Sequence, residues 1–457
     1  MRNMDFTGKK ALVIGTGLSG VGSVKRLHEI GALPVVLEQN DKMQADEVRK
    51  RLRAEDRDKT EVYIGTLPQE VLDEVAVVIP SPAVPLDTPF IQAFQDRGIP
   101  VWSEIELAFR YGKGRVIAIT GTNGKTTTTT LVYEIMKAHF KDVHLVGNIG
   151  YSYAGRAADL TDESIVVAEV SSFQLEAVEE FHAHVSAVLN ITPDHLDRHH
   201  TMEQYAYFKE RVTNKQTPDD TCVLNYDNPL TRAIGERATC HVTWFSSGEQ
   251  LQEGIFLDGE HITMRSGGIP LRVMNMNDMH LVGICNVENV MAAIGIALAL
   301  GVPIDTILHV IRHFKAVEHR IEFVATKAGV DYYNDSKATN PDSAIQGIRA
   351  MVKPTVLIGG GYDKDADYTD WIRHFDGKVK ELILIGATKE KIAACAKENG
   401  FENVLLCDTF EEALETASAH AKEGDAVLLS PACASWGMFT NYEARGRAFK
   451  DYVNHLK

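Results

Sequence analysis

Residues 118–131 read AITGTNGKTTTTTL and join a strand pattern to a helix pattern. The Gly-Lys-Thr within this stretch is typical of loops that bind nucleotide phosphates, because glycines let backbone N–H groups converge on phosphate oxygens. The widespread loop G-x-x-x-x-G-K-[ST] needs a glycine where this chain has Ile119. The loop is therefore the shorter form G-x-x-G-K-T at residues 121–126, and it predicts a nucleotide site at the end of a strand.

Two side chains of this loop carry the expected chemistry. Lys125 would place a positive charge beside the β- and γ-phosphates, and the hydroxyl group of Thr126 would coordinate Mg²⁺. The helix that follows would point the positive end of its dipole at the anion. A strand–turn–helix connection without a ligand is the alternative, but the strand before the loop and the helix after it favour the nucleotide site.

Glu169 and His195 are candidates for the same site, and Lys209 is interpreted differently. Glu169 ends an apolar run, where a carboxylate is unfavourable unless it pairs with a basic neighbour or binds a metal, and the phosphate loop favours the metal. His195 follows another strand and is a candidate ligand, although Mg²⁺ prefers oxygen. Lys209 lies on a helix that Thr201 and Gln204 would cap, and the residues alone predict an ordinary solvated lysine.

A second glycine-rich turn lies near the N-terminus. Residues 15–20, GTGLSG, follow a strand pattern and open a helix, and Glu38 ends the next strand. This spacing is typical of folds that bind a dinucleotide and use an acid to contact its ribose. The turn indicates a nucleotide, either NAD or the uridine part of a sugar nucleotide, and a tight turn without a ligand is the alternative.

The composition argues against several classes of function. The 457 residues include 47 Lys and Arg and 63 Asp and Glu, and the formal charge of 47 − 63 = −16 argues against broad binding to nucleic acid or an anionic membrane. None of the 6 cysteines forms a C-x-x-C pair, so we expect reduced thiols, without a zinc site or disulfide framework. The longest apolar segment, residues 292–302, is shorter than the roughly 18 residues that span a bilayer. We therefore expect a soluble, cytoplasmic protein.

Strand and helix patterns alternate along almost the whole chain, which predicts α/β domains with mainly parallel sheets. We expect three domains, residues 1–103 with the first glycine-rich turn, residues 104–315 with the phosphate loop, and residues 316–457. Within the second domain, the short strands and turns of residues 219–280 indicate a more antiparallel region.

The third predicted domain has polar residues after its strands. They are Arg320, Asp335, Lys337, Thr339 and Lys364. Because ligands bind at the carboxyl edge of open parallel sheets, these cationic and hydroxyl groups suit a small carboxylate substrate. Loops with ordinary surface charges are the alternative.

Seven motifs are spread over nearly the whole chain, namely GTNGKTT, GNIG, EVSSFQLE, TPDHLDRH, EHR, NDSKATN and SPACAS. In this order they resemble the Mur ligase family of bacterial peptidoglycan synthesis, whose own phosphate loop has the short G-x-x-G-K-[ST] form. The resemblance implies a Rossmann-like N-terminal domain that binds a uridine sugar nucleotide, a central P-loop ATPase domain, and a Rossmann-like C-terminal domain that binds an amino acid.

The activity that this resemblance implies is ATP-dependent addition of D-glutamate to UDP-N-acetylmuramoyl-L-alanine, through an acyl phosphate, in cytoplasmic synthesis of peptidoglycan precursors. It also implies two Mg²⁺ sites, a carbamylated Lys209, a monomer, and no nucleic-acid or membrane partner. Because the implied reacting groups lie in separate domains, we expect domain closure. The alternatives are a sibling ligase for another amino acid, a folylpolyglutamate synthase, a nicotinamide oxidoreductase, and an ATP-driven switch without catalysis.

The resemblance also assigns individual residues. Lys125, His195 and Lys209 would be catalytic. The residues that would bind the nucleotide are Gly121, Thr122, Asn123, Gly124, Lys125, Thr126, Thr127, Asn286, Arg320 and Asp335. Those that would serve the metal ions are Thr126, Glu169, His195 and Lys209. Those that would face the uridine substrate are Leu18, Ser19, Glu38, Gln39 and Asn148, and those around D-glutamate are Lys337, Thr339, Lys364, Ser435, Trp436 and Tyr442.

The chain departs from the family pattern at several of these places. Cys285 stands where a histidine is frequent, and Ala83 stands where glycine is usual. Glu38 and Gln39 replace a pair of the Asp-Thr type, and Tyr442 occupies a position where an aromatic residue without a hydroxyl occurs.

Overall fold

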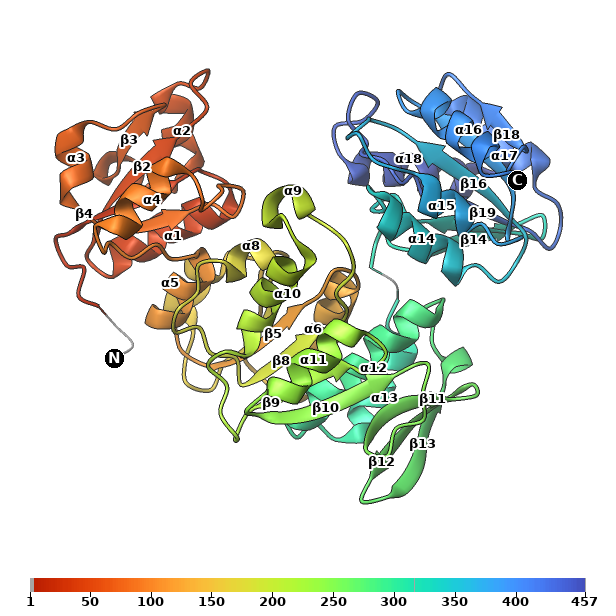
Figure 1. The fold of residues 1–457 in the computed structure, drawn as a ribbon, viewed down its shortest axis with the longest axis horizontal. Helices are drawn as coiled ribbons and strands as arrows, with labels where there is room; N and C mark the ends of the chain where they lie inside the picture. The colour runs from red at the N-terminus through yellow and green to blue at the C-terminus, as the bar shows by residue number, and fades with distance from the viewer. Residues whose placement is uncertain (1–3, 316, 457) are drawn as a thin grey trace. The chain divides into compact units, whose positions relative to one another are not determined.

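The computed structural model describes residues 4–315 and 317–456. Its strands form three sheets, of 4, 9 and 6 strands, with helices packed against them (Figure 1). Most neighbouring strands pair in parallel, so the predicted α/β fold with mainly parallel sheets is confirmed. Within the described residues, no helix combines the length and the apolar character needed to cross a membrane.

The N-terminal sheet has the order β3-β2-β1-β4, and all of its pairings are parallel. Its strands are β1 (Lys10–Ile14), β2 (Leu33–Glu38), β3 (Glu61–Ile64) and β4 (Val75–Pro80). Helices α1 (Leu18–Glu29) and α2 (Ala45–Arg51) bury their apolar residues against one face. Helices α3 (Gln69–Glu74) and α4 (Pro89–Asp96) cover the other, which explains why the strands are apolar on both sides.

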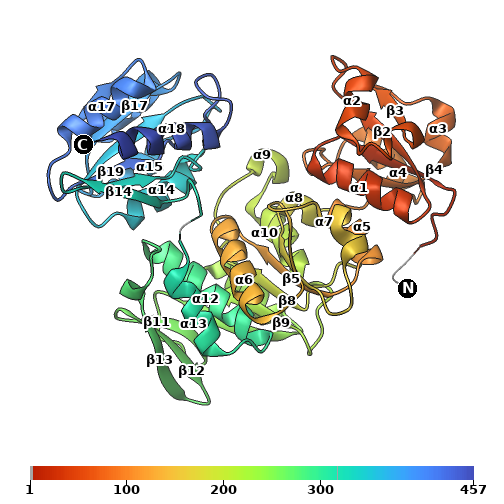
Figure 2. The same ribbon diagram turned by 180° about the vertical axis from the view of Figure 1, so that it is seen from behind.

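The central sheet has the order β13-β12-β11-β10-β9-β8-β5-β7-β6, with β5 (Arg115–Thr120) between two parallel neighbours. The other strands are β6 (Val143–Gly147), β7 (Ile165–Glu169), β8 (Val185–Val188), β9 (Thr221–Asn225), β10 (His241–Ser246), β11 (Gly254–Asp258), β12 (His261–Ser266) and β13 (Ile269–Asn275). Helices α6 (Lys125–His139), α12 (Ile284–Ala299) and α13 (Ile304–His313) lie together on one side of this sheet (Figure 2).

Other helices of this region connect the strands or lie beside the loops at their ends. They are α5 (Glu104–Tyr111), α7 (Tyr153–Arg156), α8 (Ser172–Leu175), α9 (Leu196–His199), α10 (Met202–Glu210) and α11 (Pro229–Arg237). As predicted, Thr201 caps α10, because its side chain accepts a hydrogen bond from the backbone N–H of Gln204 at 3.2 Å.

The expected antiparallel region, residues 219–280, is smaller than predicted. Strands β9, β10 and β11 are parallel to their preceding neighbours, and β11 and β12 form an antiparallel pair. Helix α11 connects β9 to β10 and carries the chain back to the start of the next strand, as a parallel pairing requires. The turn between β11 and β12 contains Gly259 with a φ of 59°, which suits a tight antiparallel hairpin.

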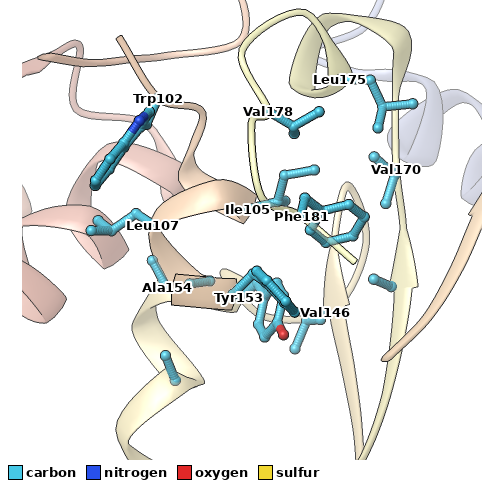
Figure 3. Packing of buried hydrophobic residues seen from close by; sticks show 14 of the residues in the cluster. Trp102, Ile105, Leu107, Val146, Tyr153, Ala154, Val170, Leu175, Val178 and Phe181 are labelled. Carbon is cyan, nitrogen blue, oxygen red and sulfur yellow. The ribbon is translucent and has the colours of Figure 1, made fainter. Parts of the chain in front are cut away.

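One hydrophobic core joins the N-terminal and central sheets (Figure 3). Trp102, Ile105 and Leu107 pack in the same cluster as Tyr153 and Phe181 (Figure 3). The predicted domain boundary after residue 103 therefore lies in a segment whose residues are buried, and this segment is not an exposed linker.

The C-terminal sheet has the order β14-β15-β19-β16-β17-β18, and the pair at one edge, β14 and β15, is antiparallel. The strands are β14 (Glu322–Lys327), β15 (Val330–Asn334), β16 (Thr355–Gly360), β17 (Val379–Ile385), β18 (Val404–Leu406) and β19 (Ala426–Leu429). Helices α14 (Pro341–Ala350), α15 (Thr369–Arg373) and α16 (Lys389–Glu398) pack on one face, and α17 (Phe410–His420) and α18 (Tyr442–His455) on the other.

By its internal contacts the chain forms two compact units. Residues 1–274 and 288–311 make the first, and residues 275–287 and 312–457 make the second. The boundaries expected after residues 103 and 315 remain predictions, and residue 316, which would begin the third domain, lies outside the described residues.

Candidate active site

The phosphate loop connects β5 to α6 in a conformation that requires its glycines. Gly121 has a φ of 151° and Gly124 a φ of 85°, and a Cβ atom on Gly124 would lie 2.2 Å from Oδ1 of Asn289. Asn190 fixes the loop, because its backbone oxygen accepts from the N–H of Thr122 at 2.9 Å and its Oδ1 accepts from the N–H of Asn123 at 2.8 Å. The loop is thus preformed at the N-terminus of α6, where backbone N–H groups favour an anion.

Helix α10 is tied to the loop through two side chains four residues apart. The hydroxyl group of Tyr205 lies 3.2 Å from Oγ1 of Thr122, and Nζ of Lys209 donates to the backbone oxygen of Gly121 at 2.8 Å. Residues four apart lie on the same helix face, so both reach the loop. Sequence reasoning missed Asn190 and Tyr205. Asn190 lies just after a strand and Tyr205 lies one helical turn before Lys209, and both positions could have indicated a place beside the loop.

Lys209 is buried, so the expectation of a solvated lysine was wrong. The residue is 1% exposed, and its ammonium group lies 4.6 Å from the centre of the Tyr205 ring. Burial lowers the pKa of Lys209 well below its usual value, and the neighbouring positive charge of Lys125 lowers it further. Lys125 itself donates to the backbone oxygens of Gly121 and Thr122, at 2.8 Å each.

Glu169, the last residue of β7, has one carboxylate oxygen available for a ligand. The residue is 1% exposed, and its Oε1 accepts from Nδ2 of Asn148 at 2.7 Å. Its Oε2 is buried and has no hydrogen-bond partner among the described residues. No basic side chain among the described residues forms an ion pair with this carboxylate. A bound cation would therefore satisfy Oε2.

His195 lies at the start of the short helix α9, with a φ of 54° and a side chain that is 48% exposed. Its Nε2 is 3.5 Å from Oδ2 of Asp194, and its ring packs on Phe173 with the ring centres 4.9 Å apart. Within residues 4–315 and 317–456, no group of three or more His, Cys, Asp or Glu side chains lies close enough together to hold a metal ion. Thr126 and Thr127 are both buried, in the first turn of α6.

The first glycine-rich turn carries a polar network that the sequence did not predict in full. Oγ1 of Thr16 donates to the carboxylate of Glu38 at 3.1 Å, and Nη1 of Arg51 donates to the same Oγ1 at 3.2 Å. Leu18 is well exposed, Ser19 is partly exposed, and Gln39 is exposed, so all three are accessible beside this network. Arg51 is a further cation at this edge.

The second compact unit contains Asn286, Arg320 and Asp335. Burial raises the pKa of Asp335 to about 7, against the opposing effects of Arg320 and of the hydroxyl group of Ser430, which donates to its Oδ2 at 2.8 Å. Asn286, in the first turn of α12, donates to the backbone oxygen of Val282 at 2.8 Å.

Four of the six residues predicted to surround D-glutamate form two cation–aromatic pairs at the carboxyl edge of the C-terminal sheet. Nζ of Lys337 lies 5.8 Å from the ring centre of Tyr442, and Nζ of Lys364 lies 5.1 Å from that of Trp436. Thr339 is half-buried in the segment after β15.

The chain is 51% identical over 453 residues to the UDP-N-acetylmuramoylalanine--D-glutamate ligase of Lachnospira eligens, which covers 99% of this chain and 100% of the relative. It belongs to the Mur ligase family. Three family models match it, "Mur ligase MurD-like, N-terminal domain" over residues 9–103, "Mur ligase middle domain" over 119–297, and "Mur ligase, glutamate ligase domain" over 319–433.

Other Mur ligases are similar in sequence or in fold. The Clostridioides difficile ligase of the same name is 41% identical, over 99% of this chain and all of the relative. The structure of UDP-N-acetylmuramate-alanine ligase MurC from Thermotoga maritima has a TM-score of 0.60 at 17% identity, covering 98% of this chain and 100% of that one. That of MurF ligase from Thermotoga maritima in complex with ADP has a TM-score of 0.60 at 15% identity, covering 98% and 96%. These two structures show that the fold is shared.

Proposed function

We propose that this Mur ligase joins D-glutamate to UDP-N-acetylmuramoyl-L-alanine through an amide bond, with ATP as the phosphoryl donor. The names of the relatives support the two substrates, and the ADP in the MurF structure supports the nucleotide. The observation that best supports phosphoryl transfer from ATP is the phosphate loop at the end of β5. Lys125 and Lys209 both donate hydrogen bonds to the backbone oxygen of Gly121 in this loop.

The triphosphate of ATP would bind at residues 121–127. The backbone N–H groups of this loop and the N-terminus of α6 would bind phosphate oxygens, and Lys125 would leave its two backbone partners to neutralise them. Asn286, Arg320 and Asp335 would contact the rest of the nucleotide. We also propose that the predicted domains close during the reaction, because the assigned reacting groups lie in separate predicted domains.

Thr126, Glu169, His195 and Lys209 would serve two Mg²⁺ ions. The unpartnered Oε2 of Glu169 fits this assignment, because a buried carboxylate oxygen needs a cation or a donor. Bound Mg²⁺ supplies positive charge that offsets the repulsion between a carboxylate and a polyphosphate.

We also propose that Lys209 is carbamylated. Its neutral amine would attack the carbon of CO₂, form an N–C bond and lose one proton, which leaves an anionic carbamate. The burial of Lys209 beside Lys125 favours the neutral amine over the ammonium ion. The product would turn a cation into an oxygen ligand, which Mg²⁺ prefers.

The uridine end of the first substrate would bind at Leu18, Ser19, Glu38 and Gln39, and its muramoyl part at Asn148. Its carboxylate attacks the γ-phosphorus of ATP, the bond from phosphorus to ADP breaks, and an acyl phosphate forms. Lys125 stabilises the negative charge that develops on the phosphoryl oxygens.

D-glutamate would bind at the C-terminal sheet, among Lys337, Thr339, Lys364, Ser435, Trp436 and Tyr442. Two lysines suit its two carboxylates, which leaves its amino group for reaction. The amine attacks the carbonyl carbon of the acyl phosphate and loses a proton, and phosphate leaves as the amide forms. Exclusion of water during these steps prevents hydrolysis of the acyl phosphate.

An ADP-release assay tests this function. Purified protein with ATP, Mg²⁺ and UDP-N-acetylmuramoyl-L-alanine should release ADP rapidly when D-glutamate is added, and slowly with L-lysine, diaminopimelate or L-alanine. Preference for one of those amino acids would assign a sibling reaction. Binding of NAD without any ATP turnover would instead favour an oxidoreductase.

We further propose a cytoplasmic monomer whose partners are small molecules. The formal charge of −16 supports the absence of nucleic-acid and anionic-membrane partners. Sedimentation of the purified protein with and without substrates tests the oligomeric state, and a stable dimer would contradict the proposal.

A further inference from the structure

Three segments with predicted amino-acid-binding residues follow neighbouring strands of the C-terminal sheet. Lys337 and Thr339 follow β15, Ser435 and Trp436 follow β19, and Lys364 follows β16. Strand β19 pairs in parallel with both β15 and β16, so the three segments begin side by side at one edge. The spacing of these segments determines whether their side chains can contact the same small ligand.

Arg445, on α18, connects two of these segments. Its Nε donates to Oγ of Ser336 at 3.0 Å and its Nη2 to the backbone oxygen of Ser336 at 2.8 Å. Nη1 and Nη2 both donate to the backbone oxygen of Cys433, at 3.2 Å each. Oγ of Ser336 in turn donates to the backbone oxygen of Tyr442, at 2.8 Å. One planar guanidinium group therefore bridges the segment that leads into Lys337 and the segment that leads to residue 435.

The same guanidinium is a buried charge without a matching ion pair. Arg445 is 1% exposed, its bonds go to carbonyl and hydroxyl oxygens, and no carboxylate among the described residues forms an ion pair with it. Burial lowers the pKa of Arg445 to about 10, so it remains a cation at neutral pH.

Asp335 is the carboxyl group whose charge acts on Arg445. Burial raises the pKa of Asp335 to about 7, so its own charge is incomplete at neutral pH. A buried cation that is only partly compensated is unfavourable by itself, and it favours an anion bound nearby.

We propose that Arg445 is a positioning residue for the amino-acid substrate. It fixes the spacing between residues 336–339 and 433–436 and adds a buried positive charge beside them. The identity of the amino acid, D-glutamate, rests on the proposed function, and the two carboxylates of D-glutamate are the anions that this charge would favour. Arg445 acts through these segments, without contact to the substrate.

Two substitutions separate the bridge from the charge. Arg445→Lys keeps the charge but loses the planar set of donors that reaches both Ser336 and Cys433, and Arg445→Gln keeps two N–H donors without the charge. The loss of hydrogen bonds from a charged group predicts a rise of about tenfold or more in KM for D-glutamate in both variants. We expect the larger rise in Arg445→Gln, because the lysine restores the charge.

Arg447→Gln is the matched control, since Arg447 is exposed on the same helix. Its KM for D-glutamate should stay within about twofold of that of the wild-type protein. Thermal unfolding of all variants, measured in parallel, shows how much of each protein is folded.

An unchanged KM for D-glutamate in folded Arg445→Lys and Arg445→Gln proteins would overturn the proposal. A loss of kcat in proportion to unfolded protein, with KM unaffected, would also overturn it and leave a purely structural role. Equal rises in the two variants would refute the contribution of the charge. A wild-type protein that does not ligate D-glutamate in the same assay would refute the proposed function instead.

Discussion

Lys125 and Lys209 donate hydrogen bonds to the same acceptor, the backbone oxygen of Gly121, with both Nζ–O distances at 2.8 Å. Two ammonium groups on one carbonyl oxygen repel each other, and the buried one is more easily deprotonated. The positive charge of Lys125 therefore favours the neutral amine at Lys209, and both side chains bind the loop at Gly121.

Substitution of Lys125 by Ala should lower kcat about 100-fold or more, because a cation that stabilises developing phosphoryl charge is removed. It should also raise the pKa of Lys209 toward its usual value, since Lys125 is one of the causes of its depression. Steady-state kinetics measures the first effect. The carbamate signal of protein in ¹³C-bicarbonate, followed by NMR, measures the second, and Lys137→Ala, an exposed lysine on the same helix, is the control.

Substitution of Lys209 by Met should separate activity from stability. A methionine of similar length removes a buried amine beside the positive charge of Lys125, while Lys125 still donates to the oxygen of Gly121. We expect a midpoint of thermal unfolding that is higher by about 2 °C or more, together with a large loss of ligation. An unfolding midpoint below that of the wild-type protein would show that the amine stabilises the loop.

The phosphate loop and the fold class could be predicted because they depend on local patterns. Glycine positions, strand ends and the alternation of strands and helices are all visible within short windows of sequence. The burial of Lys209 could not be predicted from a local pattern, because α10 (MEQYAYFKE) has no continuous apolar stripe that would show which face is buried. Tyr205 and Lys209 are its buried residues, and only the tertiary position of the helix against the loop reveals this.

Arg445 and Asn190 were missed for the same reason. The pattern of α18 gives no sign that Arg445 is buried and bridges two loops, because its partners Ser336 and Cys433 lie outside the helix, 109 and 12 residues before it. The parallel pairing of β9 and β10 was also missed, since the helical connection between them was not recognised as a crossover.

Substitution of Glu169 by Gln tests the cation at this carboxylate. The amide keeps an oxygen for Nδ2 of Asn148 but removes the negative charge, so we expect about 100-fold lower kcat and activity that requires more Mg²⁺. Folding stability should not fall, because the substitution removes a buried charge whose Oε2 has no hydrogen-bond partner among the described residues. Titration of activity with MgCl₂ makes the measurement, with the exposed Glu163→Gln as control. Wild-type Mg²⁺ dependence in Glu169→Gln would contradict the metal assignment.

His199 should make the protein less stable in mild acid. Burial lowers its pKa from 6.5 to about 4, its Nε2 contacts Oγ of Ser172 at 2.9 Å, and it packs on the rings of Tyr205 and Phe208. Because the unfolded chain binds a proton there at a higher pH than the folded chain does, this contribution is complete above the usual pKa of 6.5 and is lost as the pH falls toward 4. Replacement by Gln should remove this pH dependence, whereas replacement of the exposed His200 should retain it. Urea unfolding at pH 7 and pH 5 compares the proteins.

Substitution of Gly124 by Ala should disable the phosphate loop. The added Cβ atom would lie 2.2 Å from Oδ1 of Asn289 and would hold a residue other than glycine at a φ of 85°. We expect weaker ATP binding and a loss of stability of about 1–3 kcal/mol or more, because backbone strain and a steric overlap occur together. Gly98→Ala is the matched control, since its φ is 70° but no atom lies within 4 Å of the new Cβ atom. Isothermal titration with ATP and urea unfolding measure the two effects. Equal losses in the two variants would show that backbone strain alone acts, and that the contact with Asn289 does not constrain the loop.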